Sequence, residues 1–134
     1  MNLGRVRKAS LLAFALVVVA VAVGTLVPGG GRWLPFDAPL ATHLAAFTLT
    51  GMLARFAMPE VRWAISAALV LAVALGVAAE SLQLLVPGRT FSLTDLSTNL
   101  AGSVAGVLLA QLVLFVVTRM RLDAADKGKA AEPD

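Results

Sequence analysis

ESLQLLVPGRTFSLTDLSTNLAG, residues 80–102, lies between two of the most apolar stretches of the chain. Burying a polar or charged side chain among apolar groups costs free energy unless the group is paired. Pro87-Gly88 in the middle of the stretch favours a turn. We therefore interpret it as a turn that joins the polar ends of two apolar helices. The polar side chains that need an explanation are Glu80, Gln83, Arg89, Asp95 and Asn99.

The composition is that of an integral membrane protein. Of the 134 residues, 59% are hydrophobic and 14% are charged, which is too little polar surface for an ordinary water-soluble domain. The chain has no cysteine, so disulfides and thiolate metal sites are excluded. The formal charge is +3, but the basic residues flank apolar runs and form no patch interleaved with aromatic residues. We therefore expect the lipid bilayer, and no nucleic acid, as a partner.

The apolar runs predict an all-α fold, a bundle of four transmembrane helices. A helix crosses the hydrocarbon core with about 20 mainly apolar residues, and residues 9–27, 40–58, 63–86 and 95–118 reach this length. A cleaved signal peptide is the alternative for the first run, because basic residues precede it. No clear small-x-small cleavage site follows, so we favour a retained helix.

Residues 1–120 are predicted to form this four-helix domain as a single unit. The remaining residues, 121–134, have mixed charge and no apolar pattern. We predict that they form a disordered cytoplasmic tail.

The basic residues predict the orientation of the bundle. If the helices alternate, nine of the eleven lysines and arginines lie on one side, and only Arg32 and Arg89 lie on the other. Short loops rich in Lys and Arg stay in the cytoplasm. We therefore expect a multi-pass protein of the cell (cytoplasmic) membrane, with both termini cytoplasmic and the loops of Arg32 and Arg89 facing outward.

This orientation gathers polar side chains in one layer near the outer surface. They come from three separate parts of the sequence, so the layer predicts a shared pocket that opens outward. A single polar residue in this layer could occur by chance. An imidazole, carboxylates, amides and a guanidinium together in the same layer are less expected by chance. We assign the six residues of this layer to ligand binding: His43, Glu80, Gln83, Arg89, Asp95 and Asn99.

Small residues beneath the polar layer predict close helix packing. Gly76, Glu80 and Gln83 share one stripe of a helix, because they are four and seven residues apart. Gly102 and Gly106 form a GxxxG pattern, which lets helices approach closely in lipid. We assign Gly76, Gly102 and Gly106 to helix packing.

Each polar residue also has a simpler, structural interpretation, and this interpretation is weakest for Glu80. An acidic residue in a membrane helix costs about 2.5–3.5 kcal/mol near the midplane and marks a functional site by default. Asp95 can instead cap a helix in a capping box with Ser92, Arg89 can anchor the interface or neutralise a carboxylate, and Asn99 can bond between helices. If the protein is an enzyme, the candidate catalytic residues are His43, Glu80 and Asp95.

We predict no metal and no cofactor. One histidine and two carboxylates that are far apart in the sequence form a weak set of metal ligands.

The spacing of these residues resembles the signature of the VanZ-like membrane proteins. From Glu80 to Gly106 the pattern is E-x2-Q-x5-R-x5-D-x3-N-x2-G-x3-G, and His43 is followed by an aromatic residue four positions later. The resemblance covers roughly residues 37–117. It implies a small bacterial membrane protein of several helices.

One position departs from the family pattern. The family often has an Asp-Lys pair shortly before the histidine, where this chain has Pro39 and Leu40, and Asp37 is the nearest acid. The founding member of the family is associated with resistance to teicoplanin, a lipoglycopeptide that binds cell-wall precursors. The missing lysine weakens the transfer of that phenotype to this chain.

Three functions follow as hypotheses. The first is binding of a polar or anionic envelope ligand at the outward pocket: a lipid-linked precursor, a lipid headgroup or a glycopeptide antibiotic. The second is an intramembrane hydrolase or transferase that acts on an envelope lipid or glycan. The third is a structural membrane protein in which the polar residues only connect helices. We favour the first over an enzyme, because no dedicated nucleophile is evident.

Overall fold

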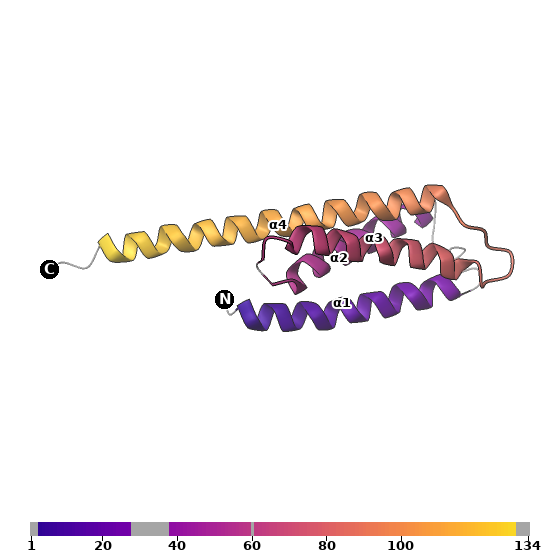
Figure 1. The fold of residues 1–134 in the computed structure, drawn as a ribbon, viewed down its shortest axis with the longest axis horizontal. Coiled ribbons are helices and arrows are strands. Elements are labelled where there is room, and N and C mark those ends of the chain that lie inside the picture. Colours follow the sequence, from indigo (N-terminus) through magenta and orange to yellow (C-terminus); the bar gives the residue numbers. More distant parts are fainter. Residues whose placement is uncertain (1–2, 28–37, 60, 131–134) are drawn as a thin grey trace.

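The computed structural model describes residues 3–27, 38–59 and 61–130 (Figure 1). In this part of the chain the fold is all-α and has four helices, as predicted. They are α1 (Leu3–Leu26), α2 (Ala38–Ala57), α3 (Ala64–Gln83) and α4 (Leu93–Ala130). The Pro28 to Gly31 break, Arg32 and Asp37 lie outside the described residues.

Helices α1 and α2 run antiparallel along each other. Near the start of α1, Arg7 Nε donates a hydrogen bond to the carbonyl of Ala57 at the end of α2, at 3.1 Å. The end of α1 and the beginning of α2 meet around a shared cavity that both Thr25 and Thr42 line. Helix α1 therefore begins, and α4 ends, at the same end of the bundle (Figure 1).

Helix α3 ends earlier than predicted, at Gln83 rather than residue 86. The next residues form tight turns, in which backbone hydrogen bonds join residues three positions apart. The N–H of Leu84 donates to the carbonyl of Ser81, and the N–H of Val86 donates to the carbonyl of Gln83. Gly88 then takes a positive φ of 79°, a conformation that favours glycine. These turns place the end of α3 beside the beginning of α4.

Helix α4 continues through Ala130, so residues 121–130 of the predicted disordered tail are helical. Figure 1 shows this segment projecting beyond the other three helices. An existing helix grows without a new nucleation cost, and this segment has alanine, arginine and lysine, which favour helix, with no proline before Ala130. Composition alone missed this continuity. Residues 131–134 lie outside the described residues.

Helix α2 packs against each of the other three helices. Its closest neighbour is α4, because glycines remove the side chains between them. A Cβ at Gly102 would lie 2.7 Å from the carbonyl oxygen of Leu44, and one at Gly106 would overlap the carbonyl of Thr48. On α2, a Cβ at Gly51 would overlap the carbonyl of Ser103. The GxxxG pattern of the sequence predicts the role of the two glycines of α4, whereas Gly51 belongs to no such pattern.

Gly76 faces the same region from α3. A Cβ there would be in ordinary van der Waals contact with Asn99 and Phe47, so its neighbours are close but leave some room. The core beneath contains the buried side chains of Phe47, Ala54, Ala68 and Val107.

Three of the four helices, α1, α3 and α4, are long and apolar enough to cross a membrane. Helix α2 is not among them, so composition supports three spans instead of the predicted four. The reason lies in its polar residues, of which Thr50 and Arg55 are both 2% exposed. Because its neighbours surround these groups, α2 needs less apolar surface than a helix that faces lipid.

Replacing Gly106 with leucine is expected to separate α2 from α4. The new side chain would overlap the backbone of Thr48, and overpacking of this kind destabilises by about 1–3 kcal/mol. Gly128→Leu is the matched control on the same helix, since a Cβ there meets nothing within 4 Å. Thermal unfolding of the purified protein in detergent, followed by circular dichroism, measures the difference. Equal midpoints for the two variants would contradict the close crossing.

Candidate functional site

Five of the six predicted ligand-binding residues form one cluster where α2, α3 and α4 meet. We call it the polar cluster. Gln83 and Asn99 are 5% and 1% exposed, and Glu80 is fully buried. Arg89, the sixth residue, lies in the turn after α3 and lines a cavity together with His43 and Gln83. The polar cluster consists of His43, Glu80, Gln83, Asp95 and Asn99.

Glu80 is the centre of the polar cluster. Its Oε1 accepts hydrogen bonds from Gln83 Nε2 and Asn99 Nδ2, both at 3.3 Å. Its Oε2 accepts one from the backbone N–H of Ser92, also at 3.3 Å. All three partners are N–H donors, which suits a carboxylate because it only accepts. The buried carboxylate therefore connects α3, the turn before α4, and α4.

Asn99 extends these contacts to α2. Its Oδ1 lies 2.8 Å from His43 Nδ1, while its Nδ2 donates to Glu80. Because the amide oxygen can only accept, the network assigns the proton to Nδ1 of His43. Nε2 then keeps its lone pair when the ring is neutral. One asparagine thus orients both a carboxylate and an imidazole.

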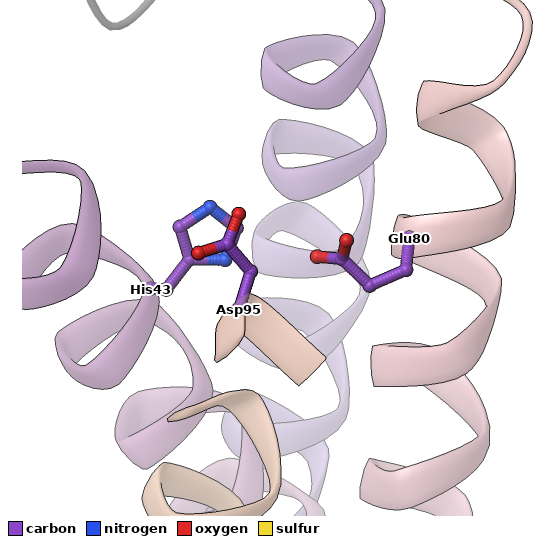
Figure 2. A group of neighbouring side chains, drawn as sticks. All are labelled: His43, Glu80 and Asp95. Carbon is purple, nitrogen blue, oxygen red and sulfur yellow. The ribbon is translucent and has the colours of Figure 1, made fainter. Parts of the chain in front are cut away.

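Asp95 completes the polar cluster beside His43 (Figure 2). One ring nitrogen of His43 and one carboxylate oxygen each of Glu80 and Asp95 all lie within 4.8 Å of one another. This agrees with the predicted shared pocket, although the sequence had indicated only a weak set of metal ligands, because the three groups are far apart along the chain. The turn between α3 and α4 brings the two carboxylates together.

The predicted capping box is only half formed. The backbone N–H of Asp95 donates to Ser92 Oγ at 3.1 Å, as a capping serine requires. In a complete box the acidic side chain would accept the Ser92 N–H in return, but here Glu80 accepts it. Ser92 was not among the predicted site residues, and its spacing to Asp95 was the signal for it.

Arg89 pairs with neither carboxylate in the structure. Its Nη1 donates to the backbone carbonyl of Thr25 at 3.4 Å, so its partner is the end of α1. The alternative in which Arg89 neutralises Glu80 or Asp95 is therefore not observed. At 3.4 Å this bond is longer than the usual 2.9–3.0 Å of an N–H···O bond.

A cavity of about 590 Å³ lies between α1, α2 and the end of α3. Most of its wall is apolar, with Val17, Val21 and Gly24 from α1 and Ala46 and Leu49 from α2. The polar residues of the wall lie at one end of the cavity, where the end of α1, the start of α2 and the end of α3 with the turn after it meet. They are Thr25, Thr42, His43, Gln83 and Arg89.

A second polar contact between helices, formed by buried Arg55 and half-buried Gln111, lies nearer the other end of the bundle. Arg55 is 2% exposed, and its Nε donates to Gln111 Oε1 across the α2–α4 crossing at 2.8 Å. Arg55 is one of the basic residues that flank apolar runs in the sequence, and its contact with Gln111 was not predicted. The signal was available, since Gln111 is the only polar residue in the apolar run from residue 104 to 117.

Fold and polar cluster together define a small all-helical protein with the character of a membrane protein. The sequence model of the VanZ/LLP1 family matches residues 4–115. Because this match covers most of the chain, the protein belongs to the VanZ-like family, as the spacing of its polar residues indicated. No curated protein and no solved structure matches the chain.

Glu80→Gln is expected to destabilise the protein by about 1–3 kcal/mol. The NH2 group of the new glutamine would face one of the three N–H donors that now bond to Glu80, and that donor would lose its acceptor. Ser81→Ala is the control, since Ser81 is exposed and its hydroxyl bonds only within its own helix, to Val77. Thermal unfolding in detergent compares the two variants with the wild type. An unchanged midpoint for Glu80→Gln would mean that the network around this carboxylate contributes little to the fold.

Proposed function

We propose that the protein binds an amphiphile of the cell envelope, with an apolar chain and an anionic headgroup. The observation that carries this proposal is the cavity, which combines a mainly apolar wall with Arg89, His43 and Gln83. Its volume of about 590 Å³ falls in the range of about 300–1,000 Å³ that is typical of ligand pockets.

The headgroup would bind at Arg89. Its planar guanidinium suits a phosphate or carboxylate, to which it can donate two parallel hydrogen bonds. Its present partner, the carbonyl of Thr25 at 3.4 Å, is neutral and could be exchanged for an anion. Gln83 and His43 line the same cavity and can bond to other polar groups of the ligand.

The chain of the ligand would lie against the wall formed by α1 and α2. This wall is lined by small and branched apolar residues, and at Gly24 a Cβ would meet nothing within 4 Å. Phosphate-bearing lipids, lipid-linked cell-wall precursors and lipoglycopeptides share the required chemistry. The family's association with teicoplanin resistance motivates including the last two classes among the ligands.

Orientation belongs to the same proposal. All four helices, α2 included, would cross the cytoplasmic membrane with both termini inside, so that Arg89 and the polar cluster lie near the outer surface. The excess of Lys and Arg at the opposite end supports this orientation.

A second candidate function is hydrolysis or group transfer on the bound lipid. The proximity of His43 to the Asp95 and Glu80 carboxylates within 4.8 Å favours it, because an imidazole oriented beside a carboxylate can act as a general base.

Arg89→Gln and Gly24→Leu are both expected to reduce binding of anionic lipid at least tenfold. The first removes a charge-assisted hydrogen bond worth about 1.5–3 kcal/mol. The second adds a side chain to the cavity wall at a position where a Cβ meets nothing within 4 Å. Native mass spectrometry in detergent, with a polyprenyl phosphate and phosphatidylglycerol as probes and phosphatidylcholine as comparator, measures retention. Arg119→Gln is the control, because Arg119 is exposed near the other end of α4.

Two results would contradict the proposed binding. One is a wild-type protein that retains the two anionic lipids no better than phosphatidylcholine, and the other is that Arg89→Gln and Gly24→Leu retain the anionic lipids as well as the control Arg119→Gln does. Conversion of the polyprenyl phosphate to a new species, abolished by His43→Ala, would favour the enzyme instead.

The orientation predicts which single cysteines a membrane-impermeant maleimide can label in intact cells. The natural chain has no cysteine, and Val61, Thr90 and Lys127 are exposed. Thr90→Cys should be labelled directly, while Val61→Cys and Lys127→Cys should need permeabilisation. If α2 did not cross, Val61→Cys would be labelled and Thr90→Cys would not.

A further inference from the structure

We propose that His43, Glu80 and Asp95 form a binding site for one divalent transition-metal ion. A nitrogen of the imidazole and an oxygen of each carboxylate lie within 4.8 Å of one another, on three different helices (Figure 2). Metal–ligand bonds of about 2.0–2.2 Å require these atoms to approach by about an ångström. Helix-borne side chains can make such a movement without rearranging the backbone.

The surroundings of these side chains match those of metal ligands. A histidine ligand usually donates its other ring N–H to an oxygen of the protein, which fixes the tautomer and the direction of the ring. Here His43 Nδ1 bonds to Asn99 Oδ1 at 2.8 Å, which fixes the direction of the ring beside the two carboxylates. Glu80 is oriented in the same way, by hydrogen bonds from Gln83, Asn99 and Ser92.

Asp95 is available because Glu80 replaces it in the capping box. Among the described residues, the structure records no hydrogen-bond partner for the Asp95 carboxylate, although its backbone N–H caps the helix through Ser92. A second carboxylate beside the fully buried Glu80 is costly in a low-dielectric region. A dication between them would balance both negative charges.

The donor set indicates which metals fit. Imidazole nitrogen suits Zn²⁺ and related ions, carboxylate oxygen also suits Mn²⁺, and Mg²⁺ and Ca²⁺ prefer oxygen ligands alone. One nitrogen with two oxygens therefore favours Zn²⁺ or Mn²⁺ over Mg²⁺ or Ca²⁺. Three protein ligands also leave coordination positions for water or for an anionic group.

The metal site shares His43 with the cavity, but Arg89 is not a metal ligand and Asp95 does not line the cavity, so these two residues separate the metal site from the proposed lipid binding. The two proposals can therefore fail separately. Asp95→Asn should lose metal binding and retain lipid binding when the latter is measured with a chelator present. Arg89→Gln should retain metal binding and lose lipid binding.

Metal binding can be tested on the full chain purified in detergent without a histidine tag and stripped with a chelator. Titration calorimetry with Zn²⁺ and Mn²⁺, checked by elemental analysis, should give one ion per chain, with Mg²⁺ and Ca²⁺ at least tenfold weaker. His43→Ala and Asp95→Asn should abolish this binding. Asn99→Ala, which removes the partner of the histidine, should weaken it by about 10–100-fold.

Asp123→Asn is the matched control for Asp95→Asn, because it removes the same charge from an exposed position of the same helix. Circular dichroism establishes that each variant is folded, and the absorption spectrum of the Co²⁺ form reports the ligands independently of affinity. Wild-type protein that binds no Zn²⁺ or Mn²⁺ would overturn the proposal. So would a folded Asp95→Asn variant that binds as tightly and gives the same Co²⁺ spectrum as Asp123→Asn.

Discussion

A carboxylate with no exposure to solvent is the constraint on which the end of the bundle around the α3–α4 turn depends. Glu80 needs donors from beyond its own helical turn, and the structure supplies them from the turn before α4 and from α4 itself. An acceptor left without these partners in an apolar interior would cost several kcal/mol. The position of the α3–α4 turn, the beginning of α4 and the direction of Asn99 are all fixed by this requirement. The fold and the proposed metal site therefore share the same hydrogen bonds.

The close crossing of α2 and α4 has a similar double role. Gly51, Gly102 and Gly106 let the two backbones touch, and this contact brings Asn99 within 2.8 Å of His43 at one end. Toward the other end the same crossing pairs Arg55 with Gln111 at 2.8 Å. Van der Waals contact and interhelical hydrogen bonds are the forces that associate helices in lipid, and both act along this one interface.

The sequence was sufficient for whatever depends on local pattern. Apolar runs located the four helices. The distribution of Lys and Arg between the loops, together with helical spacing, indicated the residues of the polar cluster. It was insufficient where a partner comes from another element or from the backbone. The Ser92 N–H carries no side-chain signature, the partner of Arg89 is a carbonyl of α1, and the burial of Arg55 depends on the facing helix. The helical state of residues 121–130 was missed because composition ignores the helix that precedes them. The sequence placed Asp95 and His43 in one pocket, but their approach to within 4.8 Å depends on how α3 ends, which no motif encodes.

The length of α4 has a mechanical consequence. A straight helix of 38 residues measures about 57 Å at 1.5 Å per residue, whereas the hydrocarbon layer is about 30 Å thick. Inclination of up to about 40°, the usual limit for such helices, shortens its projection only to about 44 Å. If one end of α4 lies at one face of the membrane, its other end must therefore extend beyond the opposite face. Arg119, Arg121 and Lys127 then lie at successive distances from the membrane along one continuous helix.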